Sequence, residues 1–107
     1  MGAFFTRGTT PDFRFTVNLD LTGWDTYVSF GQHHRELARV KDPQIEPVPG
    51  GCVISGRLSQ EQTLLFKAGN GTAQVRAYKD GIAAASNPKF RFKIYDVIMD
   101  GTIPKED

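Results

Sequence analysis

Apolar and polar side chains alternate along most of this chain, which is typical of β-strands with one buried face. Within residues 12–19 the odd positions are apolar and the even positions are polar. A period of two also marks five later segments, of which 34–41 is the least regular: 26–32, 34–41, 52–58, 73–78 and 90–95. The pattern predicts that each segment is a strand whose apolar side faces a common core.

Signals for turns and for one helix separate these segments. Asp80 and Gly81 predict a two-residue hairpin between the strand at 73–78 and a further short strand at 82–85. Ser59 and Gln62 have the spacing of a capping box, so one or two helical turns are predicted to follow Ser59. Residues 42–51 hold three prolines and two glycines, and they predict a loop, because neither a helix nor a central strand tolerates that composition.

Together these elements predict an all-β domain, an immunoglobulin-like β-sandwich of about seven strands with one short helical crossover. A small barrel is the alternative, because even strand spacing suits it as well. The Cys–Trp–Cys spacing of antibody domains is absent, so the immunoglobulin-like label describes architecture alone. The sandwich is expected over residues 12–95, between an extended N-terminal arm at 1–11 and a C-terminal arm at 96–107. The predicted core consists of Phe13, Phe15, Val17, Trp24, Val28, Phe30, Ile54, Leu58, Leu65, Phe66, Val75, Ala77, Phe90, Phe92 and Ile94.

Composition agrees with one domain and limits its chemistry. The chain has 107 residues, 39% of them hydrophobic, and thirteen basic against twelve acidic residues give a formal net charge of +1. Its single cysteine, Cys52, excludes an internal disulfide and is expected to be a small buried core residue. The first residues lack a signal-peptide pattern, and no apolar run approaches the roughly 18 residues that span a membrane. We therefore expect a protein that is soluble where it is made and has no membrane partner.

The sequence does not predict catalytic chemistry. His33 and His34 are the only histidines, and strand alternation points neighbouring side chains to opposite faces, so the two do not easily share a site. Neither histidine has a partner at metal-ligand spacing. The carboxylates are scattered beside Gly, Pro and Thr, where they are ordinary turn formers. We expect no enzyme activity, no metal and no cofactor.

A basic stripe on the strand at 90–95 is the best signal for a nucleic-acid partner. It consists of Lys89, Arg91 and Lys93, with Arg76 on a neighbouring strand. Single-strand binding also needs outward aromatic rings for stacking, whereas the phenylalanines of this strand alternate to the opposite face. A solvated outer face is therefore favoured, and no nucleic acid is expected as a partner.

A carbohydrate-binding module that touches a host surface is a further alternative. Aromatic platforms for a sugar ring could come from Trp24, Tyr27, Tyr78 and Tyr95. Trp24 has the parity of the core in its strand, which weakens this hypothesis.

Both ends of the chain carry large apolar residues outside the predicted strands. Exposing such a side chain is unfavourable, since burying one stabilises by about 1.5–3 kcal/mol. Either the ends fold back as extra strands or a plug, or they are arms that dock on a neighbouring subunit by strand addition or in a groove. The candidate partner-binding residues of these arms are Phe4, Phe5, Arg7, Thr9, Thr10, Pro11, Ile98, Met99 and Ile103.

Five stretches of the sequence resemble short virion structural proteins of phages and prophages of Gram-positive bacteria. Those proteins begin with an Arg-Gly-Thr-Thr-Pro motif ahead of an alternating strand, as in RGTTPDFRFTV here, which leads into LDLTGWDTYVSFGQ. The resemblance continues through ISGRLSQEQTLLFKAG, AQVRAYKDGIAAAS and DVIMDG, so it covers nearly the whole chain. More distantly, the layout is similar to the N-terminal β-sandwich of phage baseplate upper proteins. Two departures are the six residues ahead of Arg7 and the proline-rich loop at 42–50.

The resemblance implies a virion structural protein of the tail, baseplate or connector, assembled in the bacterial host cytoplasm. Its partners would be other virion structural proteins, in a homo-oligomer or in several copies per particle. A capsid decoration or head-fibre protein is the alternative, and the motif carries no catalytic residues to transfer.

Overall fold

The structure is a computed structural model that describes residues 3–85, 90–99 and 101–104. These residues form an elongated molecule of 48 × 27 × 24 Å. Nine strands and one short helix occur in the described residues: β1 (Ala3–Thr6), β2 (Asp12–Val17), β3 (Asp25–Gln32), β4 (Arg35–Lys41), β5 (Gln44–Val48), β6 (Gly51–Arg57), α1 (Gln60–Leu64), β7 (Gly69–Lys79), β8 (Ile82–Ala85) and β9 (Phe90–Tyr95).

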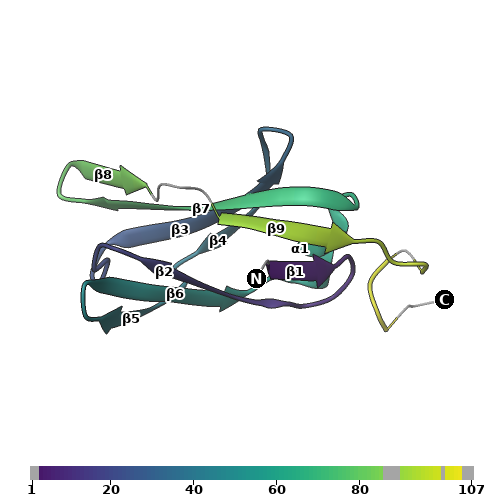
Figure 1. Ribbon diagram of the computed structural model, residues 1–107, viewed down its shortest axis with the longest axis horizontal. Coiled ribbons are helices and arrows are strands. Elements are labelled where there is room, and N and C mark those ends of the chain that lie inside the picture. Colours follow the sequence, from purple (N-terminus) through teal and green to yellow (C-terminus); the bar gives the residue numbers. More distant parts are fainter. Residues whose placement is uncertain (1–2, 86–89, 100, 105–107) are drawn as a thin grey trace.

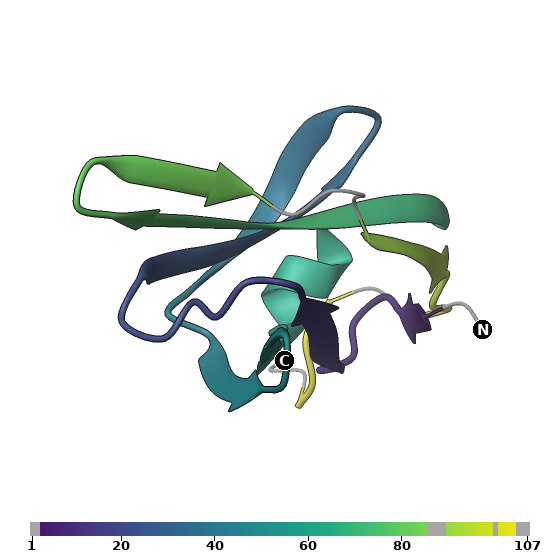
Figure 2. The ribbon, with the colours of Figure 1, turned by 60° about the vertical axis from the view of Figure 1, so that its left-hand side comes forward.

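The strands form two sheets that pack against each other (Figure 1). The larger sheet has the order β1-β9-β7-β3-β4, with β8 also paired to β7, and the smaller sheet has the order β2-β6-β5. Paired strands are antiparallel except β1 and β9, which are parallel. The helix α1 lies between the two layers at one end of the molecule (Figures 1 and 2). The prediction of an all-β sandwich with one short helix is confirmed.

The chain crosses between the sheets at both sides of the sandwich. On one side, residues 7–11 connect β1, at the edge of the larger sheet, to β2, at the edge of the smaller sheet. On the other side, only residues 42 and 43 connect β4 to β5. Asp42 turns the chain there with a φ of 53°, and its N–H donates to the Thr26 carbonyl at 3.0 Å. Each side of the sandwich is therefore joined covalently.

Phenylalanine rings form a continuous network inside the sandwich. Phe5 illustrates the packing, with its ring centroid 5.5 Å from that of Phe66 and 5.2 Å from that of Phe92. Such aromatic pairs stabilise beyond the apolar area they bury. Seven of the eight phenylalanines belong to the network: Phe5, Phe13, Phe15, Phe30, Phe66, Phe90 and Phe92. Six of these rings lie on strands and Phe66 follows α1. The period of two in the sequence therefore identifies most of the residues of this core.

Local turn and cap signals are also confirmed. The Ser59 hydroxyl accepts a hydrogen bond from the Gln62 N–H at 3.1 Å, and the Gln62 side chain accepts one from the Ser59 N–H at 2.9 Å. Asp80 and Gly81 form the turn between β7 and β8 with φ values of 50° and 83°. Positive φ at both positions is the geometry of a two-residue hairpin whose twist matches its strands.

Three details differ from the sequence-based expectations. The predicted loop at 42–51 contains β5, in which Pro47 is tolerated because β5 is an edge strand and needs ladder donors on one side only. Residues 3–6, expected in an N-terminal arm, form β1, so the described strands number nine rather than about seven. Leu65 was predicted in the core but is 57% exposed, because it follows the last residue of α1 and the adjacent Phe66 enters the core instead.

Candidate functional site

The two adjacent phenylalanines of β1 have opposite environments. Phe5 is 6% exposed and belongs to the core, whereas Phe4 is 68% exposed. The Phe4 ring meets the exposed Tyr95 of β9 edge to face, with 5.7 Å between the ring centroids. Phe5 is thus a core residue, and its expected role as a partner-binding residue is wrong, because strand alternation turns it inward.

Arg7 holds the end of the helix rather than reaching outward. Its Nε donates to the Phe66 carbonyl at 2.6 Å, and its Nη2 donates to the Leu64 carbonyl at 3.3 Å. Its Nη1 forms an ion pair with the Asp96 carboxylate at 2.7 Å. The last carbonyls of a helix have no partner within the helix, and α1 has no basic residue in its last turn. Arg7 therefore supplies a C-terminal cap from a distant part of the chain.

The residues after Arg7 are fixed to the same helix. The hydroxyl of Thr63, a buried residue of α1, accepts from the Gly8 N–H at 3.0 Å and lies 3.0 Å from the Thr9 carbonyl, to which it donates. The Leu58 N–H donates to the Pro11 carbonyl at 3.0 Å. The side chains of Thr9 and Thr10 are exposed. The Arg-Gly-Thr-Thr-Pro motif thus anchors the crossing from β1 to β2, and the expected extended arm is wrong for these residues.

The residues after β9 run over the surface beside α1. Asp96 pairs with Arg7, and the Val97 side chain lies beside Gly8. Further along, the Gln60 side chain donates to the Ile103 carbonyl at 2.8 Å and accepts from the Ile103 N–H at 2.7 Å. Ile98 is fully exposed. Side-chain hydrogen bonds therefore attach this segment without burying most of its large apolar residues.

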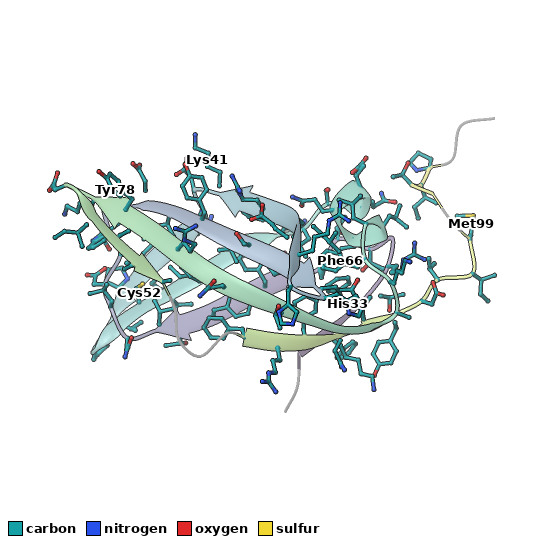
Figure 3. All side chains as sticks on the ribbon, turned by 90° about the horizontal axis from the view of Figure 1, so that it is seen from above. His33, Lys41, Cys52, Phe66, Tyr78 and Met99 are labelled. Atoms are coloured by element: carbon teal, nitrogen blue, oxygen red, sulfur yellow. The ribbon has the colours of Figure 1, made fainter. Side chains whose placement is uncertain are left out.

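Several large apolar side chains on β1, just after α1, and at and beyond the end of β9 are exposed, and Met99 marks the position of the last of these segments in Figure 3. We call this surface the apolar end, and it consists of Phe4, Leu65, Tyr95, Ile98, Met99 and Ile103. The outer edge of β1 belongs to the same region. Because the Arg7 N–H donates to the Tyr95 carbonyl, alternation directs the N–H and C=O of Phe4 away from β9. Among the described residues, no strand pairs with that side of β1.

A second candidate lies on the outer face of the larger sheet. A hollow of about 260 Å³ lies over β3, β4, β7 and β8 and is lined by Tyr27, Ser29, Glu36, Arg39, Arg76, Ala77, Tyr78 and Ala83. A neighbouring hollow of about 220 Å³ shares Ser29 and Glu36 with it and reaches His34, Arg35 and Thr72. We call the two hollows together the polar groove.

Paired and unpaired charges coexist in the polar groove. The Glu36 carboxylate accepts hydrogen bonds from Arg39 at 2.9 and 3.2 Å and from the Ser29 hydroxyl at 2.5 Å. These contacts, that with Arg39 first, lower the pKa of Glu36 below its usual value. The Arg39 guanidinium also lies 6.0 Å from the centroid of the Tyr27 ring. The Arg76 guanidinium makes no hydrogen bond or ion pair within the described part of the chain.

The histidines form a turn rather than a strand face. His33 and His34 lie between β3 and β4 with φ values of 52° and 62°, and both side chains are exposed. Cys52 is buried, as predicted, and its Sγ lies 3.2 Å from the Leu19 carbonyl. Across residues 3–85, 90–99 and 101–104, no group of three His, Cys, Asp or Glu side chains could hold a metal ion.

The structure separates the residues of the predicted basic stripe. Arg91 and Lys93 are exposed on β9, opposite Thr72 and Asn70. Arg76 lies further along β7, where its partner strand is β8 instead. Lys89 lies outside the described residues.

The four aromatic residues considered for sugar binding also lie in different parts of the molecule. Trp24 is half-buried against the core, and Tyr95 belongs to the apolar end. Tyr27 and Tyr78 both line the polar groove. Sequence alone could not reveal this, because the register of β3 with β7 and β4 decides which outward residues meet.

No protein-family model matches this chain, and a comparison with curated proteins gives no significant match. No helix in the described ranges has the length and apolar character needed to cross a membrane.

Proposed function

We propose that this chain is a structural protein of a phage particle, a tail, baseplate or connector component present in several copies, and that it acts through protein–protein contacts. The observation that carries the proposal is the apolar end, where six large apolar or aromatic side chains are each at least 48% exposed. Its wider support is the sequence resemblance to phage structural proteins, which covers nearly the whole chain.

The apolar end combines two features of contact surfaces. Burying a large apolar side chain stabilises by about 1.5–3 kcal/mol, so a partner that covers Ile98, Met99 and Phe4 gains free energy. The unpaired side of β1 adds backbone donors and acceptors, which an extended partner segment could satisfy by strand addition. The apolar end therefore offers apolar side chains that would contribute binding free energy and, on β1, backbone groups that would set the orientation of a partner.

A capsid decoration or head-fibre protein is the second form of this proposal. It would use the same surface and differ only in the neighbour that covers it. Separating heads from tails before the protein is quantified distinguishes the two positions.

The first test is mass spectrometry of particles purified from the phage or prophage that encodes the chain. The proposal predicts peptides of this chain in purified particles, at several copies per particle. Finding the protein in the lysate but never in the particles would overturn the proposal.

The second test asks whether the apolar end makes the contact. Ile98→Glu should lower incorporation into particles, whereas Ile82→Glu, a matched change at the exposed tip of the β7–β8 hairpin, should not. Hydroxyl-radical footprinting should show Met99 protected in the particle and modified in the free protein. Equal incorporation of both variants, with Met99 equally modified in both states, would exclude the apolar end as the contact surface.

A further inference from the structure

We propose that the polar groove binds an acidic saccharide, with its carboxylate on Arg76 and its sugar rings against Tyr27 and Tyr78. This site is distinct from the apolar end. Figure 3 shows Tyr78 and Met99 near opposite ends of the molecule. The two surfaces can therefore be occupied, and tested, independently.

The aromatic groups of the groove suit a sugar ring. Tyr27 is half-buried and the Arg39 guanidinium lies over its ring, so only the uncovered part of the ring can meet a sugar, while Tyr78 is 52% exposed and projects from β7 near the hairpin. Both line the same hollow, with Ala83 of β8 beside them. The faces of sugar rings carry C–H groups that pack on aromatic rings, while the tyrosine hydroxyls remain available for hydrogen bonds. Ala83 is the cross-strand partner of Tyr78, and its side chain is small.

The charges of the groove favour an anion. Three arginines line the two hollows, Arg35, Arg39 and Arg76, against a single carboxylate, Glu36. Glu36 is already committed to Arg39 and Ser29. Arg76, on the neighbouring strand directly across from Tyr27, is left to bind a ligand carboxylate through a bidentate pair.

The polar groups and the size of the groove distinguish a saccharide from a simple ion. The two hollows, of about 260 and 220 Å³, meet at Ser29 and Glu36. The Glu36 carboxylate keeps one acceptor position on Oε1 for a sugar hydroxyl, and Thr72 adds a hydroxyl in the second hollow. Volumes of this size suit two or three sugar rings in an open groove more closely than one small anion.

The test uses trigalacturonate as the probe and two matched comparison ligands. Maltotriose has similar rings without carboxylates, and a triglutamate peptide has three side-chain carboxylates without sugar rings. Calorimetry on the full chain should show binding of trigalacturonate and at least about tenfold weaker binding of both comparison ligands. Amide chemical shifts should change at Tyr27, Ser29 and Arg76 rather than at Phe4 and Ile98.

Variants then assign the roles. Arg76→Gln should weaken trigalacturonate binding by about tenfold or more, because a charge-assisted hydrogen bond is lost. Lys93→Gln removes the same charge from an exposed position on β9, outside the groove, and should leave binding unchanged. Tyr78→Ala should also weaken binding, and because Tyr78 is 52% exposed the variant should keep the melting temperature of the wild-type chain, which separates lost binding from lost folding.

Three outcomes would overturn the proposal. They are no binding of trigalacturonate, equal binding of maltotriose or triglutamate, and equal losses for Arg76→Gln and Lys93→Gln. None of these measurements requires the particle or a partner at the apolar end. If saccharide binding is absent, the proposed structural function is unaffected. If the protein is absent from particles, the saccharide proposal is unaffected.

Discussion

The segment before β2 and the segment after β9 have similar apolar content, but only the first contains a strand that pairs with a sheet. Residues 3–6 form β1, whose backbone pairs with β9 and whose Phe5 packs between Phe66 and Phe92. Residues 96–99 and 101–104 belong to no sheet, and Ile98 is fully exposed. The comparison teaches that a terminal apolar residue joins the core when its backbone joins a ladder, because the ladder fixes which way its side chain points.

The sharpest test of this difference truncates one apolar residue in each segment. Phe5→Ala should lower the free energy of unfolding by about 3–5 kcal/mol, because it leaves a cavity between the rings of Phe66 and Phe92. Ile98→Ala should change it by less than about 0.5 kcal/mol, because the side chain is exposed. Urea unfolding of both variants measures the two values, and comparable losses would contradict the distinction.

Arg7 connects the two segments, so its removal should affect both. Arg7→Ala leaves the carbonyls of Leu64 and Phe66 without this donor and should cost about 1–3 kcal/mol in unfolding free energy. Arg7→Lys should restore only part of this loss, because an ammonium cannot reproduce the fork that reaches both carbonyls and Asp96. Thermal unfolding of the two variants distinguishes these cases; full recovery with lysine would show that charge alone matters.

Gln60 attaches only the later segment, so its removal should separate local from global stability. Gln60→Ala breaks both hydrogen bonds to Ile103. It should lower the global unfolding free energy by less than about 1 kcal/mol, while the Ile103 amide exchanges its hydrogen markedly faster. Hydrogen-exchange NMR measures the effect, with the Phe5 amide as the internal control. Faster exchange at Phe5 as well would indicate that the later segment supports the sheet.

The smallest expected effect depends on pH. Hydrogen bonds from Arg7 and from the Val97 N–H lower the pKa of Asp96. A carboxyl with a lowered pKa in the folded state contributes stability above its unfolded pKa and loses that contribution as pH falls through its folded pKa. The difference in melting temperature between the wild-type chain and Asp96→Asn should therefore be constant near neutral pH and shrink under acid. Asp12→Asn breaks the exposed pair with Arg57, which lowers the pKa of Asp12 in the same way, and so serves as the comparison for a carboxylate paired within the smaller sheet.

Local sequence signals predicted the parts of the fold that neighbours along the chain determine. Alternation identified the inward faces of β2, β7 and β9, and the spacing of Ser59 and Gln62 identified the cap of α1. The turn at His33 and His34 gave no such signal, because histidine is not a common residue at positive φ. β5 was missed because its proline, Pro47, is compatible with an edge strand as well as with a loop.

The candidate sites depend on contacts between residues far apart in sequence. Arg7 meets the Phe66 carbonyl across 59 positions, and no local pattern indicates that a motif near one end caps a helix in the second half. The polar groove requires the register that places Arg76 opposite Tyr27. Sequence analysis could name Tyr27 and Tyr78 as outward aromatics, but it could not place them in one hollow with Glu36 and Arg39.

The parallel pairing of β1 with β9 has a mechanical consequence. A force that pulls the chain backward from Ala3 and forward from Tyr95 acts along the two strands in opposite directions. Because the strands lie side by side in the same direction, such a force loads their hydrogen bonds together in shear, rather than opening them one after another. The Arg7–Asp96 ion pair, just beyond the last paired residues, would share that load. The molecule is therefore arranged to resist stretching along its length more strongly than peeling across its sheets.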